Sequence, residues 1–204
     1  MNKLNRGKLL VLSGPSGVGK STVIGGMRQR HPEMYFSVSA TTRPMRDGDA
    51  EGVTYLFKTR EQFEDMIQNH AFYEYAQYAD NYYGTPKAPV DQRLEQGIDV
   101  IMDIDVQGAL QIKERCSDAV LIFVAAPSFD IIEQRLRGRG DTREEDMVKR
   151  LTQAKWEYSQ AGKYDYIVIN DVATRTVDEI DAILTAEKQR AERMLDVIKL
   201  EESL

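Results

Sequence analysis

The chain has 204 residues, a length that favours one domain with inserted segments over two independent domains. Its formal net charge of −6 argues against a surface that neutralises a nucleic-acid backbone, so we expect no nucleic-acid partner. The single cysteine, Cys116, and a leading stretch without an apolar signal core indicate a reducing cytoplasm, and no apolar run is long enough to span a bilayer, so we expect no membrane partner.

The first predicted element is a buried strand in "KLLVLSG", residues 8–14, and the glycine-rich stretch "SGPSGVGKST" overlaps its end. Residues 14–21 fit the pattern G-x-x-x-x-G-K-[ST], in which backbone N–H groups and a lysine hold phosphates and a hydroxyl meets Mg²⁺. A helix is expected in "KSTVIGGMRQRH", with its positive end under the anion. The pattern predicts a nucleoside triphosphate site at Gly14, Pro15, Ser16, Gly17, Val18, Gly19, Lys20, Ser21 and Thr22, with Lys20 catalytic and Ser21 a metal ligand.

The next segment, about residues 37–81, predicts a small β-rich insertion. It mixes β-branched and turn residues in "VSATTRPMRDGDAEGVTYLF" and then offers a helix candidate, "TREQFEDMIQNH". Arg43 and Arg46 stand three residues apart, a spacing that can aim two guanidinium groups at one phosphate, and Tyr55 and Tyr83 add hydroxyl donors. Each of these residues taken alone is more typical of a solvated surface.

Three further apolar runs predict strands, "VIMDID" (100–105), "AVLIFVAAP" (119–127) and "YIVIND" (166–171). Segments of helical character separate them, so a parallel sheet with crossover helices, an α/β fold, is the economical architecture. We expect the core at about residues 7–36, 82–127 and 161–204. Between its last two parts, about residues 128–160, the stretch "RLRGRGDTREEDMVKRL" is arginine-rich and glycine-hinged, and we expect it to move.

Apolar residues recur at helical intervals from Val177 to about Leu200 and predict one amphipathic helix. Two uses of its apolar face stay open: packing back on the sheet, or a dimer face. A homo-oligomer is therefore left open.

The order and spacing of several motifs resemble those of guanylate kinases from about Lys8 to Ala186. The motifs are "SGPSGVGKST", "FSVSATTRPMRDGDAEGVTYLF", "NYYGTP", "DIDVQGA" and "GRGDT" followed by "VKRL". The resemblance implies a P-loop NTPase core with an inserted GMP-binding domain and a mobile helical lid. It also implies Mg²⁺-dependent transfer of the γ-phosphoryl group of ATP to GMP or dGMP.

The resemblance also assigns roles to individual residues. It places Lys20, Arg43, Arg139 and Arg150 in catalysis, the last two as lid arginines that approach the transferring phosphoryl group, with Arg135 as a further candidate. It assigns the GMP phosphate to Arg43, Arg46, Tyr55 and Tyr83, and the guanine to Ser39, Glu74, Thr85 and Asp105.

The chemistry of the residues agrees with these roles. Guanine presents donors at N1 and the 2-amino group and an acceptor at O6, so a carboxylate such as Glu74 and a hydroxyl such as Thr85 complement it. Glu74 also fits a satisfied structural carboxylate. Asp103 can orient the Mg²⁺ shell together with Ser21, although a structural role stays open for it, and Asn170 is placed on the ATP side. The acceptor phosphate oxygen is already ionised, so no general base is required.

Three other functions are considered. Protein-binding modules of the same fold typically lack the P-loop lysine and lid arginines, whereas Lys20, Arg139 and Arg150 are present here. A kinase for AMP would not need a carboxylate facing N1, because adenine has no N1 proton. A regulatory GTPase would need a specificity motif of the N-K-x-D kind, which the sequence lacks.

Overall fold

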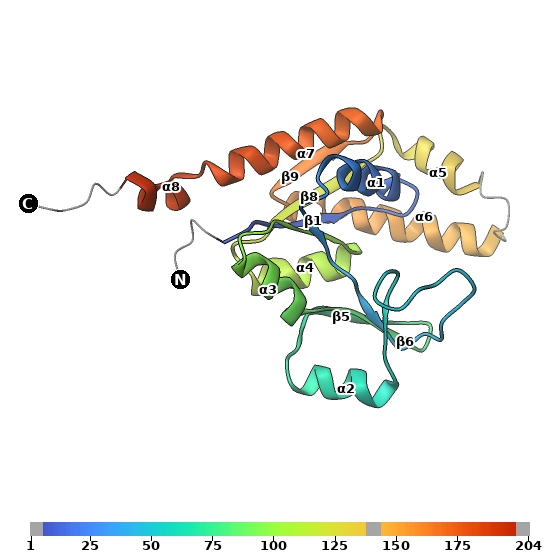
Figure 1. Ribbon diagram of the computed structural model, residues 1–204. Coiled ribbons are helices and arrows are strands. Elements are labelled where there is room, and N and C mark those ends of the chain that lie inside the picture. The colour runs from blue at the N-terminus through green and yellow to red at the C-terminus, as the bar shows by residue number, and fades with distance from the viewer. Residues whose placement is uncertain (1–5, 138–143, 199–204) are drawn as a thin grey trace, which may run out of the picture.

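The computed structural model describes residues 6–137 and 144–198, and its centre is a five-stranded parallel sheet (Figure 1). In chain order the strands of this sheet are β1 (Leu9–Ser13), β2 (Tyr35–Phe36), β7 (Val100–Asp103), β8 (Val120–Ala125) and β9 (Tyr166–Ile169). In space their order is β2-β7-β1-β8-β9. The α/β sheet and the strands predicted from the apolar runs are therefore confirmed.

Helices cover both faces of this sheet. The helices α1 (Lys20–Arg30) and α7 (Ala173–Lys188) pack on one face, and α3 (Lys87–Glu95) and α4 (Val106–Arg115) pack on the other. Strand β1 is apolar throughout because Leu10 and Leu12 face the first helix pair while Leu9 and Val11 face the second. Within the two described ranges, no helix is both long and apolar enough to cross a membrane.

A second, four-stranded sheet carries the predicted insertion and lies below the central sheet in Figure 1. Its strands are β3 (Ala40–Thr41), β4 (Leu56–Phe57), β5 (Phe72–Tyr78) and β6 (Asn81–Pro86), in the spatial order β4-β3-β6-β5. Helix α2 (Arg60–Gln68) begins at a capping box formed by Thr59 and Gln62. Its fully buried Phe63 stacks on Phe72 at a centroid distance of 4.3 Å and so fixes the helix on the sheet.

The second sheet reaches further along the chain than the sequence analysis expected. Residues 82–86 were assigned to the core, but β6 pairs with β3 through Ala40 and Gly84 and with β5 through Glu74 and Thr85. The ladder with β5 is a hairpin, whereas the ladder with β3 joins residues more than 40 positions apart in sequence, and composition alone did not reveal it.

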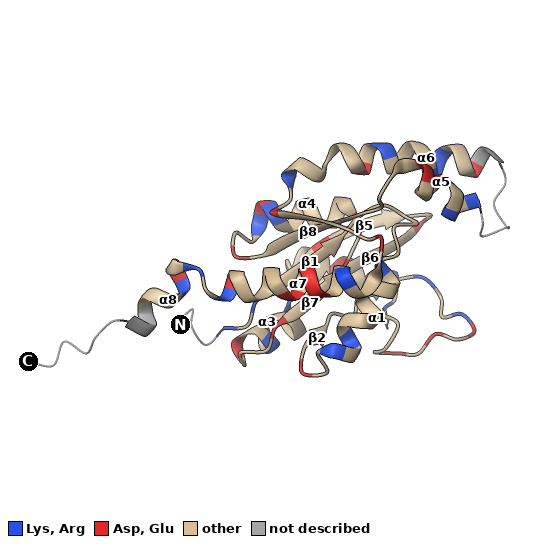
Figure 2. Cartoon of the chain, turned by 90° about the horizontal axis from the view of Figure 1, so that it is seen from above, with Lys and Arg blue, Asp and Glu red and all other residues tan. Residues whose placement is uncertain are grey.

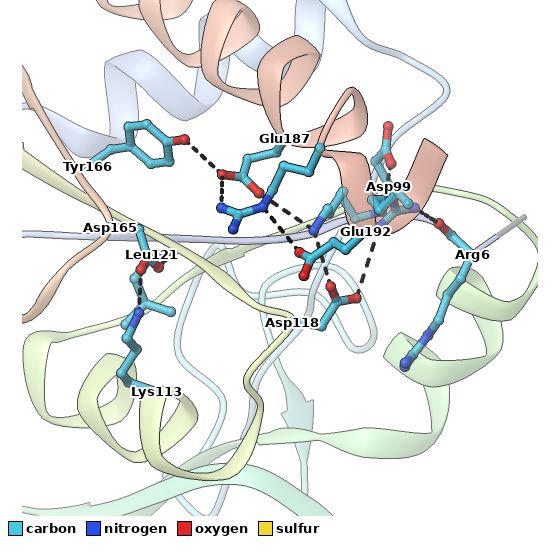
Figure 3. Close-up of polar contacts among 12 residues, drawn as sticks. Arg6, Asp99, Lys113, Asp118, Leu121, Asp165, Tyr166, Glu187 and Glu192 are labelled. Atoms are coloured by element: carbon cyan, nitrogen blue, oxygen red, sulfur yellow. Dashed lines mark hydrogen bonds and ion pairs between the residues drawn. The ribbon is translucent and has the colours of Figure 1, made fainter. Parts of the chain in front are cut away.

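The predicted single helix over residues 177–200 is wrong in its continuity. The structure ends α7 at Lys188 and starts a separate helix, α8, over Ala191–Ile198. Of the two uses left open, packing on the sheet holds for α7, whose Val177, Ile180 and Leu184 are buried in the core. The break lets Arg193 fold back, where it donates a hydrogen bond to the backbone oxygen of Arg6 (Figure 3).

Lys8 lies at the amino end of β1 and is 2% exposed, which makes it the centre of a buried ionic network. Its Nζ lies 3.2 Å from Oδ1 of Asp118 and 3.6 Å from Oε2 of Glu187. Tyr166 donates a further hydrogen bond of 2.7 Å to Glu187 (Figure 3). The network ties β1 to the end of α7, at the edge of the sheet opposite the glycine-rich loop.

We expect Lys8→Met to destabilise the fold by about 3 kcal/mol, because it leaves the buried carboxylate of Glu187 without its lysine partner. Urea unfolding followed by circular dichroism measures this. The matched control is Lys149→Met, which removes the exposed ion pair with Asp146 and should cost less than about 1 kcal/mol. Equal losses of unfolding free energy in the two variants would show that the buried network stabilises the fold no more than an exposed ion pair does.

Candidate active site

The loop between β1 and α1 adopts a conformation that only glycine accepts. Gly17 and Gly19 have φ angles of 88° and 91°, in the left-handed region. A Cβ on Gly14 would come within 2.2 Å of the backbone oxygen of Val124, and a Cβ on Gly19 within 2.6 Å of Nδ2 of Asn170. Gly19 caps α1 without a side-chain hydrogen bond, so N–H groups of the first turn are left for an anion.

Two side chains from distant parts of the chain hold this loop. Asn170, which follows β9 and is 5% exposed, donates a hydrogen bond of 2.7 Å from Nδ2 to the backbone oxygen of Val18. Arg135 donates to the backbone oxygens of Gly17, at 3.3 Å, and Val18, at 3.2 Å. The sequence analysis placed Asn170 near ATP but missed Thr176, whose hydroxyl donates to Oδ1 of Asn170 at 3.1 Å and orients its amide.

A pocket of about 510 Å³ opens beside the loop. Its lining joins the loop to the ends of β9 and α5 (Phe129–Arg137) and consists of Gly17, Gly19, Ser21, Thr22, Arg135, Asn170, Asp171 and Ala173. Ser21 and Thr22 are exposed at the start of α1. This pocket therefore combines a phosphate cradle with space for the rest of a nucleotide.

Lys20 projects between the loop and the end of β7. Its Nζ donates to the backbone oxygen of Gly14 at 2.9 Å and lies 4.0 Å from Oδ1 of Asp103. The two residues meet because β1 and β7 run parallel with Leu12 opposite Asp103, so their carboxyl ends coincide. Partial burial raises the pKa of the Asp103 carboxyl, while the charges of Lys20 and Arg28 oppose that rise.

A second pocket, of about 240 Å³, lies between the central sheet and the inserted sheet. We call it the acceptor pocket. It is lined by Ser39, Tyr55, Glu74, Ala76, Tyr83, Gly84, Asp103, Ile104 and Asp105. The structure thus brings three predicted base readers and two predicted phosphate binders into one cavity, and Asp103 connects that cavity to Lys20.

Glu74 is the buried carboxylate of the acceptor pocket, with 6% of its surface exposed. The hydroxyl of Thr85, itself fully buried, donates to Oε1 of Glu74 at 2.7 Å. Burial raises the pKa of Glu74 to about 7, and the nearby Asp105 carboxylate adds to the rise. A carboxylate held this way favours a ligand that donates hydrogen bonds to it.

Gly108 is a site residue that the sequence analysis missed. A Cβ at this position would come within 2.8 Å of Oε2 of Glu74, so only glycine leaves room for the carboxylate. The N–H of Gly108 donates to Oδ1 of Asp105 at 2.7 Å and caps α4. Asp105 therefore caps α4 with one carboxylate oxygen. From the motif "DIDVQGA" the sequence analysis had predicted only a base-reading role for this residue.

Arg43 is held in place by Asp49, another residue that the sequence analysis missed. Arg43 is 9% exposed and donates from Nη2 to Oδ2 of Asp49 at 2.8 Å. The same oxygen accepts the backbone N–H of Arg46 at 2.8 Å, so one carboxylate organises the turn around both arginines. The guanidinium of Arg43 lies 5.3 Å from the ring centroid of Tyr55, whose ring packs edge-on against Tyr83 at 6.0 Å. Arg46 itself is exposed.

The predicted lid consists of α5 and α6 (Glu144–Ser159), along which basic and acidic residues are interspersed (Figure 2). Both helices are docked, because Leu136 of α5 and Met147 of α6 are buried in the core cluster of the central sheet. Arg150 is exposed on α6. Arg139 lies outside the described residues, and the motion of the lid stays a prediction.

Comparison with known proteins adds to this geometry. A family model described as guanylate kinase matches residues 6–187. The chain belongs to the guanylate kinase family. A guanylate kinase of Synechococcus sp. (strain JA-3-3Ab) is 48% identical over 88% of this chain and 82% of the relative, and one of Carboxydothermus hydrogenoformans is 46% identical over 94% of each. A crystal structure of guanylate kinase from Anaplasma phagocytophilum covers 96% of this chain and 95% of its own, with a TM-score of 0.74 and 30% identity.

These findings confirm the family that the motifs indicated and the α/β fold implied by it. The roles given to individual residues stay predictions. Four of the predicted ATP-site residues, Gly17, Gly19, Ser21 and Thr22, line the pocket beside the loop, which we call the donor pocket, and five of the predicted acceptor-site residues line the acceptor pocket. Arg43 and Thr85 are buried next to the acceptor pocket through Tyr55 and Glu74.

Proposed function

We propose that this chain transfers the γ-phosphoryl group of ATP to GMP or dGMP, giving ADP and GDP or dGDP. The observation that carries the proposal is the buried pair of Glu74 and Thr85 in a pocket that Asp103 connects to the P-loop lysine. A base-reading carboxylate beside a phosphate cradle is what a guanine-specific phosphotransferase needs.

On the donor side, ATP occupies the pocket of about 510 Å³, with its phosphates on free backbone N–H groups of the loop and of the first turn of α1. Lys20 then neutralises charge that builds up on the β- and γ-phosphates. Arg135 and Asn170 keep the loop carbonyls of residues 17 and 18 turned away from those phosphates, because both side chains donate hydrogen bonds to them.

Hard oxygen donors at the same edge of the sheet fit a Mg²⁺ ion. The Ser21 hydroxyl is exposed at the first turn of α1, and the Asp103 carboxylate lies 4.0 Å from Lys20. Mg²⁺ prefers oxygen ligands and keeps several waters, so one hydroxyl and one water-bridged carboxylate suit it. When bound, the ion neutralises the β- and γ-phosphate oxygens of ATP.

On the acceptor side, Glu74 accepts hydrogen bonds from N1–H and the 2-amino group of guanine. Thr85 already donates to Glu74, so it holds the carboxylate in position, and the Ser39 hydroxyl in the same lining supplies a donor for O6. Arg43, Arg46, Tyr55 and Tyr83 bind the GMP phosphate. Its ionised oxygen attacks the γ-phosphorus directly and in line, without a general base, while arginines neutralise the charge between the two polyanions.

Substrate choice tests this function. We expect coupled measurement of ADP formation to show rapid turnover with GMP and dGMP and little with AMP, CMP or UMP. AMP has no N1 proton and presents an amino group in place of O6, so it leaves the buried carboxylate of Glu74 unpaired. Faster turnover with any of the other monophosphates, or none with GMP, would contradict the proposal.

The pH dependence of GMP binding follows from the pKa of Glu74, which burial raises to about 7. Guanine requires the ionised carboxylate, so the KM for GMP should rise about tenfold between pH 8 and pH 6. The GMP phosphate also titrates near this range. Glu74→Gln provides the control, because it keeps the phosphate titration and loses the carboxylate. Identical pH slopes in the two proteins would show that Glu74 does not titrate with binding.

A cytoplasmic location is part of the proposal and rests on the single free cysteine, Cys116. Light scattering coupled to gel filtration would determine whether α8, whose Leu195 is 53% exposed, joins two copies of the chain.

A further inference from the structure

A second chamber, of about 210 Å³, adjoins the acceptor pocket. We call it the Arg28 chamber. Its polar lining consists of Arg28, Ser37, Ser39, Thr54, Tyr55 and Asp103. Three of these residues, Ser39, Tyr55 and Asp103, also line the acceptor pocket, so the two cavities share a wall. None of the roles described above uses Arg28, Ser37 or Thr54.

Arg28 is held in position by an aromatic ring and interacts through its charge with Asp103. Its guanidinium carbon lies 4.2 Å from the ring centroid of Phe36, which fixes the plane of the group by stacking. Within residues 6–137 and 144–198 no hydrogen bond or ion pair joins Arg28 to another side chain. Two residues further along α1, Arg30 is bound to Asp178 at 2.5 Å and Asp181 at 2.8 Å. The N–H donors of Arg28 are therefore available to a ligand.

The shared wall indicates which part of the nucleotide meets the chamber. Ser39 belongs to the base end of the acceptor site and Tyr55 to its phosphate end. In a nucleoside monophosphate the ribose joins these two ends. The side of the ribose therefore faces the shared wall and the Arg28 chamber beyond it, where the donors of Arg28 and the hydroxyls of Ser37 and Thr54 match the hydroxyl groups of a sugar.

We propose that the Arg28 chamber is a ribose subsite in which the guanidinium of Arg28 donates a hydrogen bond to the 2′-hydroxyl oxygen of the acceptor nucleotide. This subsite gives the chain a preference for GMP over dGMP that the base and phosphate contacts cannot supply, since the two substrates share those groups. The inference rests on the proposed function, because it takes GMP as the occupant of the acceptor pocket.

Arg28→Met tests the subsite, since methionine keeps an unbranched stem against Phe36 but has no N–H donor. We expect kcat/KM for GMP to fall about five- to tenfold, while kcat/KM for dGMP changes less than about twofold. Titration calorimetry with each nucleotide and no ATP should show the same selective loss of affinity. GMP lacking only the 3′-hydroxyl should behave like GMP in both proteins.

Arg30→Met is the matched control, because Arg30 lies on the same helix and pairs with α7 instead of lining the chamber. It should leave the ratio of GMP to dGMP unchanged. Equal losses for GMP and dGMP in Arg28→Met, or wild-type protein with no preference between them, would overturn the subsite. Absence of GMP turnover in the wild type would instead contradict the proposed function, and calorimetry would still decide the ribose contact. Thermal unfolding of each variant verifies the fold.

Discussion

Lys20→Ala should lower kcat for phosphoryl transfer by about 10²-fold or more, the size of effect seen when a preorganised electrostatic contact to the transition state is lost. Nζ of Lys20 is placed for this contact, 2.9 Å from the Gly14 carbonyl inside the loop and 4.0 Å from Asp103 at the entrance to the acceptor pocket. Lys20 lies between the two pockets, because its neighbours Gly19 and Ser21 line the donor pocket and Asp103 lines the acceptor pocket. Steady-state ADP formation with saturating GMP measures the loss.

The fold should survive this substitution, because Lys20 is partly exposed and its contacts are polar ones at the protein surface. Thermal unfolding monitored by circular dichroism verifies that. Lys188→Ala, at the far end of α7 and paired with Asp99, removes the same charge away from both pockets and should keep wild-type turnover. Near wild-type turnover in Lys20→Ala would remove the P-loop from the proposed mechanism.

Glu74→Gln should lower kcat/KM for GMP by a factor corresponding to roughly 2–4 kcal/mol, or about 30- to 700-fold. The substitution replaces one acceptor oxygen with an amide donor that faces the donors of guanine. Glu74 is 6% exposed and lines the acceptor pocket, so once guanine fills that pocket water has little access to the mismatched groups. The KM for ATP should hardly change, because the P-loop is a separate site. Steady-state kinetics with GMP, IMP and AMP measure the effect.

The analogues separate base reading from a structural role. In the wild type, IMP should be poorer than GMP because it lacks the 2-amino group, and AMP should be worse by about 10⁴-fold. Glu114→Gln, an exposed position on α4, is the matched control and should change nothing. If Glu74→Gln kept the wild-type preference for GMP over both analogues, Glu74 would be a structural carboxylate and another group would read guanine.

Local patterns sufficed for much of the fold. The runs that became β1, β7, β8 and β9 are apolar on both faces of the sheet, so each strand could be recognised from its own residues. The helix α2 was expected in "TREQFEDMIQNH", and the structure adds that a capping box of Thr59 and Gln62 starts it. The end of the inserted sheet and the break after Lys188 were not recognised. Both depend on pairing with distant segments, β3 in one case and the backbone of Arg6 in the other.

The candidate site likewise has some features that the local sequence sets and others that depend on tertiary structure. The glycines and Lys20 of the P-loop are set by the sequence itself, because a loop that turns backbone N–H groups onto phosphates needs a fixed local spacing of residues. The sequence also indicated the family, which the comparisons confirm, and the residues proposed to bind guanine. Tertiary structure alone decided that Glu74 is buried against Gly108, that Asp49 holds Arg43 and that Asn170 supports Val18 from across the sheet. The desolvation that shifts a pKa, and the hydrogen bonds that fix a guanidinium or an amide, come from atoms that neighbour one another only after the chain has folded.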